Sequence, residues 1–266
     1  MNRLHKLLIV ILLCFLAVAI VCCLDPIPQN PSYHLFADAR TLAGMSFFFN
    51  VTSNLPFLLI GFWGLRLCLR KEGVVFSSPS ASRAWLSLFA GVFAVGLGSA
   101  WYHLAPDNER LVWDRLPMTL VFMSFCAMLV SERVSPAGGT VMLILLNGIG
   151  IFSVWYWHIT DHGGGGDLRP YVLVQFAPMV ILPVLLLLFR EGPPLFPSLF
   201  WLFVWYVLAK VLEHYDIAVY RFTGFVSGHT LKHLAASAAV YCMLAILLAR
   251  RKMNETIPSP IHENSF

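Results

Sequence analysis

The sequence predicts an all-α fold, a polytopic transmembrane bundle, on three observations. Hydrophobic residues make up 58% of the 266 residues and charged residues only 12%, which is about half the charged fraction of a soluble domain. Repeated apolar runs approach or exceed the roughly 20 residues with which a helix crosses a bilayer core. Short polar connections join these runs, so little of the chain is expected outside the membrane.

Eight apolar segments set the organisation of the chain. We expect helices at residues 7–24, 42–68, 84–104, 111–131, 139–159, 168–189, 196–217 and 229–249. The first is longer than a signal-peptide hydrophobic region and no A-x-A cleavage pattern follows it, so we expect it to be retained. The chain then divides into an N-terminal helix with its linker (1–32), a seven-helix core (33–249) and a polar tail (250–266).

Charge indicates the orientation, because cytoplasmic loops are enriched in lysine and arginine. With the N-terminus in the cytoplasm, most of the 18 basic residues lie inside and most of the 14 acidic residues lie outside. Eight helices then place both termini in the cytoplasm. This orientation gathers a group of histidines at the non-cytoplasmic end of the bundle, namely His34, His103, His158, His162, His214, His229 and His233.

Composition also excludes some classes of function. A net charge of +4 without a basic, aromatic-rich block argues against a nucleic-acid partner, and no obligate protein partner is evident. The six cysteines fall in or beside apolar segments and form no CxxC pair, so a disulfide framework is not indicated.

The stretch SGHTLKHLAAS at residues 227–237 carries a histidine pair. His229 and His233 are four residues apart at the start of the last helix, so both rings project from one face. Two imidazoles one turn apart can bind a single metal ion, as in H-E-x-x-H. Paired interfacial histidines have the same spacing, so the pair alone leaves both interpretations open.

A second polar stretch, GSAWYHLAPDNERLVWDRLPM at residues 98–118, favours the metal site. Ser99 lies one turn before His103, Pro106 ends the helix, and Asp114 lies near the start of the next one. The helical hairpin therefore places Ser99, His103 and Asp114 at one depth, level with the outer end of the last helix. Ionisable residues in membrane helices usually face the bundle interior, so we expect one shared site.

Three histidines with room for water are the composition of a catalytic zinc site. Zinc is expected rather than iron or copper, because imidazole suits it and no thiolate or redox partner is placed nearby. The expected nucleophile is a zinc-bound water whose pKa falls toward about 7. Asp114 would hold or deprotonate this water, and Ser99 would donate a hydrogen bond to the developing oxyanion. Such a site would cleave an acyl bond.

These two stretches, together with FFFNVTSNLPFLLIGFWGL at residues 47–65, resemble the alkaline ceramidase family of the CREST superfamily of membrane hydrolases. The resemblance covers roughly residues 33–249 and includes the run of Asn50, Ser53 and Asn54. It implies a seven-helix core that hydrolyses the amide bond of ceramide to a sphingoid base and a fatty acid, with the first helix outside that core. A membrane lipid, ceramide or another N-acyl lipid, is the implied partner.

The resemblance also implies roles for individual residues. The zinc ligands fall on His103, His229 and His233, the serine on Ser99 and the water-orienting aspartate on Asp114. A calcium ion is doubtful, because the acidic cluster of eukaryotic alkaline ceramidases is reduced here. Its region holds only two aspartates, Asp25 and Asp38, and Phe47 occupies a position where an acidic residue is expected.

Other functions and roles stay open. The same superfamily includes receptor-like proteins, so a non-catalytic lipid receptor or sensor with structural zinc is one alternative. A b-type haem protein with His103 and a last-helix histidine as axial ligands is another. Glu213 is expected to pair with Lys210, and the alternative for Glu213 or Asp216 is support of a metal-bound imidazole.

Two outer segments also have alternative interpretations. The linker segment YHLFADARTLAG at residues 33–44 is expected to be solvated or ion-paired, with lipid-headgroup contact as the alternative. The glycine-rich loop TDHGGGGDLRPY at residues 160–171 predicts a mobile lid or a close crossing between helices.

Overall fold

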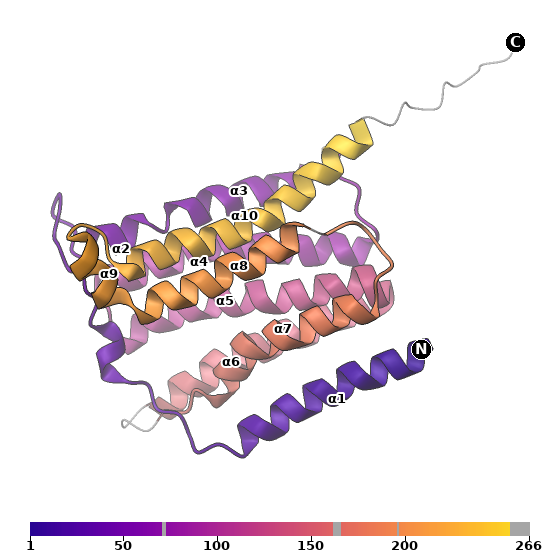
Figure 1. The fold of residues 1–266 in the computed structure, drawn as a ribbon, viewed down its shortest axis with the longest axis horizontal. Coiled ribbons are helices and arrows are strands. Elements are labelled where there is room, and N and C mark those ends of the chain that lie inside the picture. The colour runs from indigo at the N-terminus through magenta and orange to yellow at the C-terminus, as the bar shows by residue number, and fades with distance from the viewer. Residues whose placement is uncertain (71–72, 162–165, 196, 256–266) are drawn as a thin grey trace, which may run out of the picture.

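A computed structural model describes residues 1–70, 73–161, 166–195 and 197–255. These residues form helices joined by short connections and contain no strand, which confirms the all-α class. Most of the helices run side by side along one direction (Figure 1). Their bounds are α1 Arg3–Cys22, η1 Pro31–His34, α2 Phe48–Thr52, α3 Leu55–Arg70, α4 Pro79–Leu104, α5 Asn108–Leu129, η2 Val130–Val134, α6 Pro136–Asp161, α7 Arg169–Leu188, α8 Ser198–His214, α9 Asp216–Thr223 and α10 Gly228–Glu255.

Seven helices of the described chain are long and apolar enough to cross a membrane. They are α1, α2 with α3, α4, α5 with η2, α6, α7 and α10. The remaining expected segment, 196–217, forms the 17-residue helix α8, which is followed directly by the short helix α9. The chain is therefore an integral, multi-pass membrane protein, as its composition predicts.

The first core helix is shorter than expected. The predicted segment begins at residue 42, but the chain turns there, with an isolated bridge between Leu42 and Met45. Ala43 and Phe47 adopt positive φ angles of 51°, which a helix does not allow. Helix α2 begins at Phe48 and breaks after Thr52, and α3 resumes at Leu55. The start predicted for this helix was therefore wrong.

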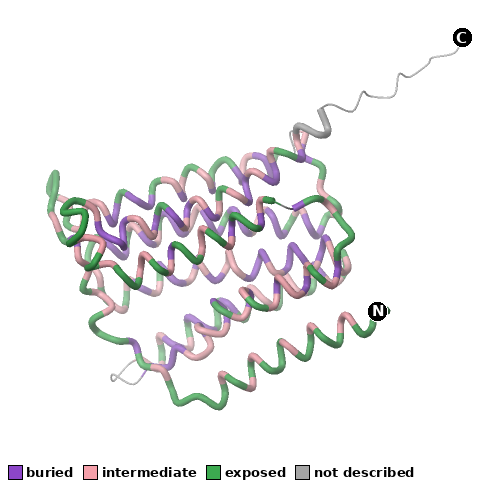
Figure 2. The backbone as a smooth tube through the Cα atoms, viewed as in Figure 1, coloured by how far each residue is buried: buried purple, intermediate pink, exposed green. Residues whose placement is uncertain are grey.

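Helix α4 lies in the middle of the bundle and packs against α3, α5 and α6, while α10 packs against α8 and α3. The core contains the stacked rings of Trp85 and Phe89, both fully buried, with centroids 5.9 Å apart. Helix α1 lies at the margin, contacts mainly α7 and buries none of its residues (Figure 2). Leu7 and Val10 of α1 nevertheless pack against the core as partly buried side chains.

Two glycines bring the helices together where the polar residues lie. A Cβ atom on Gly98 would collide with the backbone carbonyl of Trp113, so α4 and α5 meet closely beside Ser99. A Cβ atom on Gly228 would collide with the carbonyl of Leu212, so α10 begins directly against α8. Helices α2 and α9 lie at this same end of the bundle (Figure 1).

A buried ion pair joins the helices at the opposite end. Arg250 of α10 donates to both carboxylate oxygens of Glu132 at 2.7 and 2.9 Å, and the indole N–H of Trp85 donates to Glu132 at 3.0 Å. A buried charge pair of this kind is stabilised by close geometry and by hydrogen bonds such as these three. It fixes η2 and α4 to the end of α10.

Candidate functional site

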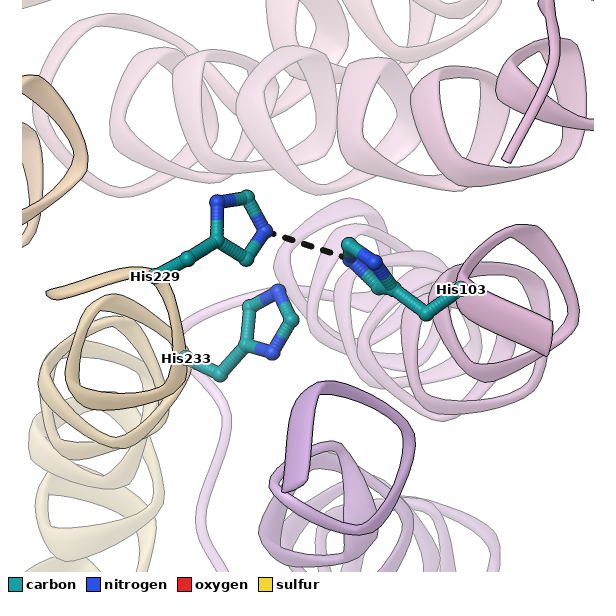
Figure 3. A group of neighbouring side chains, drawn as sticks. All are labelled: His103, His229 and His233. Carbon is teal, nitrogen blue, oxygen red and sulfur yellow. Dashed lines mark hydrogen bonds between the residues drawn. The ribbon is translucent and has the colours of Figure 1, made fainter. Parts of the chain in front are cut away.

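The end of α4 and the start of α10 bring together the three histidines that the sequence predicts to share a site. His103, His229 and His233 are all buried, and their ring centroids lie 4.8 to 4.9 Å from one another. The Nε2 atoms of His103 and His229 are 3.2 Å apart. The rings extend from two separate helices into a common space (Figure 3).

The three imidazoles fit a metal ion. One nitrogen of each lies within 4.8 Å of the others. Two nitrogens at 2.0–2.1 Å from a tetrahedral ion are about 3.3 Å apart, close to the His103–His229 separation of 3.2 Å. The cluster can therefore hold a divalent ion that accepts neutral imidazole.

The break between α2 and α3 positions His233. The Oγ atom of Ser53 lies 2.7 Å from Nδ1 of His233, and Nδ2 of Asn54 lies 3.5 Å from the same atom. Asn50 accepts a hydrogen bond from Thr230 at 2.8 Å, which ties α2 to α10. Ser53 Oγ donates to the carbonyl of Asn50 at 3.1 Å, so its oxygen can accept the proton of Nδ1, and in that tautomer Nε2 of His233 is available to a ligand. Reasoning from the residues alone gave Ser53 no role, although polar residues in an apolar segment were the available signal.

Ser99 and Asp114 face the same space as His233. Both are buried, interact through their side chains, and line one cavity with His233 and Lys232. The cavity continues down α4 to Leu88, about 16 Å from Ser99 at 1.5 Å per residue. Most of its remaining wall is apolar and includes Phe57, Val92, Phe125, Leu202, Ala239 and Met243. The arrangement places polar groups at one end of a long apolar chamber.

The linker before α2 covers the histidines, which sequence reasoning did not predict. The ring of Phe36 lies 4.7 Å from that of His103 and 4.3 Å from that of His229, centroid to centroid. Asp216 holds the linker there, because it accepts hydrogen bonds from the backbone N–H groups of Ala37 and His229 at 2.9 and 2.7 Å. Asp216 thus contacts the backbone of His229 and not its imidazole.

Glu213 forms the ion pair expected with Lys210, at 2.8 Å, and a second one with Lys232 at 2.6 Å. This confirms structural pairing for Glu213. The second lysine comes from α10, so the carboxylate joins α8 to the helix that carries the histidine pair.

The linker residues are ion-paired, as expected. Arg40 donates to both oxygens of Asp38 at 2.8 and 2.7 Å. Burial alone raises the pKa of Asp38, but the hydrogen bonds and charge of Arg40 outweigh this and hold its pKa below the ordinary value. His34 in the same linker hydrogen-bonds the hydroxyl of Tyr102 and the amide oxygen of Asn108, both at 2.8 Å.

Of the other histidines predicted at this end, the described ones, His34, His158 and His214, do not join the cluster. His34 is engaged in the linker, and Nε2 of His158 lies 3.8 Å from the exposed carboxylate of Glu109. His162 and the first three glycines of the glycine-rich loop lie outside the described residues, so its expected role as a lid or a crossing stays a prediction. Beside this loop, Arg169 pairs with Asp167 at 2.9 Å.

Fold and site together define a multi-pass membrane protein with a buried histidine cluster beside an apolar chamber. A model of the Ceramidase family matches residues 43–189, and the chain belongs to this family. The match includes Ser99, His103 and Asp114, whereas His229 and His233 lie beyond its end. A comparison with curated proteins gives no match. Family membership supports, in general, a membrane hydrolase that acts on the amide bond of a lipid such as ceramide.

Proposed function

We propose that this protein is a zinc-dependent amidase of the bilayer that hydrolyses the N-acyl bond of ceramide or a similar N-acyl lipid. The products are a free base and a fatty acid. The observation that supports this most directly is the convergence of three buried imidazoles with Ser99 and Asp114 at the end of an apolar cavity.

His103, His229 and His233 would hold the ion through one nitrogen each. Zinc bound there supplies Lewis acidity, which polarises an amide carbonyl and lowers the pKa of water toward about 7. Ser53 supports this role by engaging Nδ1 of His233, so that the ring keeps the tautomer and orientation of a ligand.

Asp114 and Ser99 supply the proton transfer and the hydrogen bond that amide hydrolysis requires. Asp114 accepts a proton from the attacking water and delivers it to the departing nitrogen. Ser99 donates a hydrogen bond to the carbonyl oxygen as negative charge develops there. The carbonyl carbon gains the hydroxyl group, the C–N bond breaks, and the nitrogen leaves as an amine.

The acyl chain occupies the apolar cavity, with the amide group at the polar end that His233, Ser99 and Asp114 share. The distribution of basic residues supports cytoplasmic termini and an active site near the non-cytoplasmic face. In that orientation the substrate reaches the site from within the bilayer.

Zinc content and hydrolysis of fluorescent ceramide, measured on one detergent-purified preparation, test the proposal. We expect His229→Ala to lose both metal and hydrolysis, and Asp114→Ala to retain the metal and lose hydrolysis. His158→Ala is the matched control, because His158 lies at the same end outside the cluster, and it should retain both. Full metal occupancy in His229→Ala would contradict the ligand assignment. Wild-type protein that holds zinc and binds N-acyl lipids without cleaving any would favour the receptor alternative.

A further inference from the structure

A second pocket adjoins Asp114 and contains a buried arginine that forms no salt bridge with a carboxylate of the described residues. Arg115 of α5 is only 5% exposed. Its Nη2 donates to the amide oxygen of Gln29 at 2.6 Å, while Nη1 has no hydrogen-bond partner among the residues that the structure describes. Unpaired buried guanidinium groups are rare, because burial of a charge is costly unless it is hydrogen-bonded and paired.

Three aromatic rings surround this guanidinium group. The centroids of Trp157, Tyr171 and Tyr33 lie 4.4, 4.9 and 5.5 Å from its central carbon. Aromatic faces stabilise a cation without accepting its N–H hydrogen bonds. The rings therefore hold the charge in place without satisfying the hydrogen-bonding capacity of Nη1.

Arg115 lines a pocket of about 150 Å³, here called the Arg115 pocket, whose lining also includes Tyr33, Gln175, Lys210, Glu213 and Lys232. This volume exceeds what one water needs by about tenfold, so a group of several heavy atoms fits. The Arg115 pocket shares Asp114, Met118 and Lys232 with the apolar cavity. The two spaces thus meet beside the proposed proton-transfer residue.

The charges of the Arg115 pocket favour an anion. Three cationic side chains, Arg115, Lys210 and Lys232, line it with two carboxylates, Asp114 and Glu213. Glu213 is already bound by both lysines. A ligand carrying negatively charged oxygens would accept the free Arg115 N–H in a charge-assisted hydrogen bond and balance the remaining positive charge.

We propose that the Arg115 pocket binds an anionic oxygen group on the amine side of the substrate. This inference rests on the proposed function and narrows its substrate class. The acyl chain would lie in the apolar cavity and the amide beside Asp114. A carboxylate or phosphate on the nitrogen-bearing half of the lipid would then reach Arg115. The preferred substrates are then anionic N-acyl lipids. Neutral ceramide leaves the guanidinium unpaired and binds less tightly.

Matched lipid pairs test this proposal with the full-length protein. One pair is N-palmitoylglycine and its neutral amide, N-palmitoylglycinamide, which share the acyl chain and the scissile bond. The other is ceramide 1-phosphate and ceramide. Dissociation constants come from displacement of fluorescent ceramide at low temperature, and rates of hydrolysis come from the same samples. We expect at least one anionic lipid to bind about tenfold or more tightly than its neutral partner, and the pair that responds identifies carboxylate or phosphate.

Variants of Arg115 assign the preference to this side chain. Arg115→Gln should reduce the preference to about twofold or less, and Arg115→Lys, which keeps the charge, should retain part of it. Arg110→Gln is the matched control, because Arg110 lies on the same helix, over Trp101 and outside the pocket, and it should leave the preference unchanged. Gln29→Ala removes the protein acceptor of Arg115 but not its charge. If Gln29→Ala keeps the preference for the anionic lipid, that preference comes from anion binding by Arg115 and not from a purely structural role of its bond to Gln29.

The outcomes distinguish this inference from the proposed function. Equal binding of both members in each pair, or a preference that persists in Arg115→Gln, overturns the anion site even if every lipid is cleaved. Failure to cleave any N-acyl lipid overturns the amidase, while an Arg115-dependent preference in binding would still establish the anion site.

Discussion

The Oγ atom of Ser53 lies 2.7 Å from Nδ1 of His233, although 180 residues separate them in the chain. The contact exists because the first core helix breaks after Thr52, so that Ser53 faces α10 and not the continuing helix. A residue outside the proposed ligand set thereby fixes one of the ligands.

Ser53→Ala should weaken metal binding without abolishing it. Loss of a hydrogen bond to a ligating histidine typically costs 10–100-fold in affinity or activity, and we expect a loss of about this size. Competition with a zinc chelator measures the affinity. Thr52→Ala is the control, because Thr52 is exposed and its hydroxyl donates to the backbone carbonyl of Phe48 in its own helix. Equal affinities of the Ser53→Ala variant and the wild type would refute this role.

Asp114→Asn should separate metal binding from turnover. The amide keeps the size of the side chain but cannot accept the proton, so ceramide hydrolysis should fall by about 10²–10⁴-fold. Zinc content should equal that of the wild type, since Asp114 is not among the proposed ligands. A variant that loses the metal in proportion to its activity would place Asp114 in the coordination set instead.

Gly98→Ala should disturb the packing of α4 on α5. The added Cβ would meet the carbonyl of Trp113, and relief of the clash must move Ser99 away from Asp114. We expect about 1–3 kcal/mol of destabilisation together with reduced hydrolysis, measured by unfolding in detergent and by turnover. Gly148→Ala is the matched control, because a Cβ atom there meets nothing within 4 Å. This variant should be as stable as the wild type or more stable by about 0.5–1 kcal/mol. Similar behaviour of the two variants would argue against the close contact.

Removal of one partner of the Glu132–Arg250 pair should cost about 3–5 kcal/mol of stability, because the other charge stays buried and unpaired. Thermal unfolding of Arg250→Met in detergent measures this. The double variant Glu132→Leu with Arg250→Met leaves no buried charge and should recover most of the loss. A double variant less stable than Arg250→Met alone would show that the pair has a different role.

The helical class and much of the candidate site could be predicted from the sequence, for physical reasons. Apolar run lengths specify membrane helices, and the four-residue spacing of His229 and His233 fixes their common face. Pro106 forces the hairpin that sets Ser99, His103 and Asp114 at one depth. Each of these relations depends on residues that are near each other in the chain.

Two of the missed features depend on distant segments, and the third is a local turn. Phe36 covers the histidines because Asp216 holds the linker, and Gln29 reaches Arg115 across 86 residues. The helix expected from residue 42 starts at Phe48, since the apolar run hides a turn with positive φ angles. No local pattern encodes the contacts of Phe36 and Gln29, which only the packed bundle defines.

X-ray absorption spectroscopy of the zinc-loaded wild-type protein tests the central claim most directly. Convergence of His103, His229 and His233 predicts one zinc per chain, with three imidazole nitrogens and one further light-atom ligand at about 2.0–2.1 Å. Sulfur at about 2.3 Å, or fewer than three imidazoles around the ion, would contradict it.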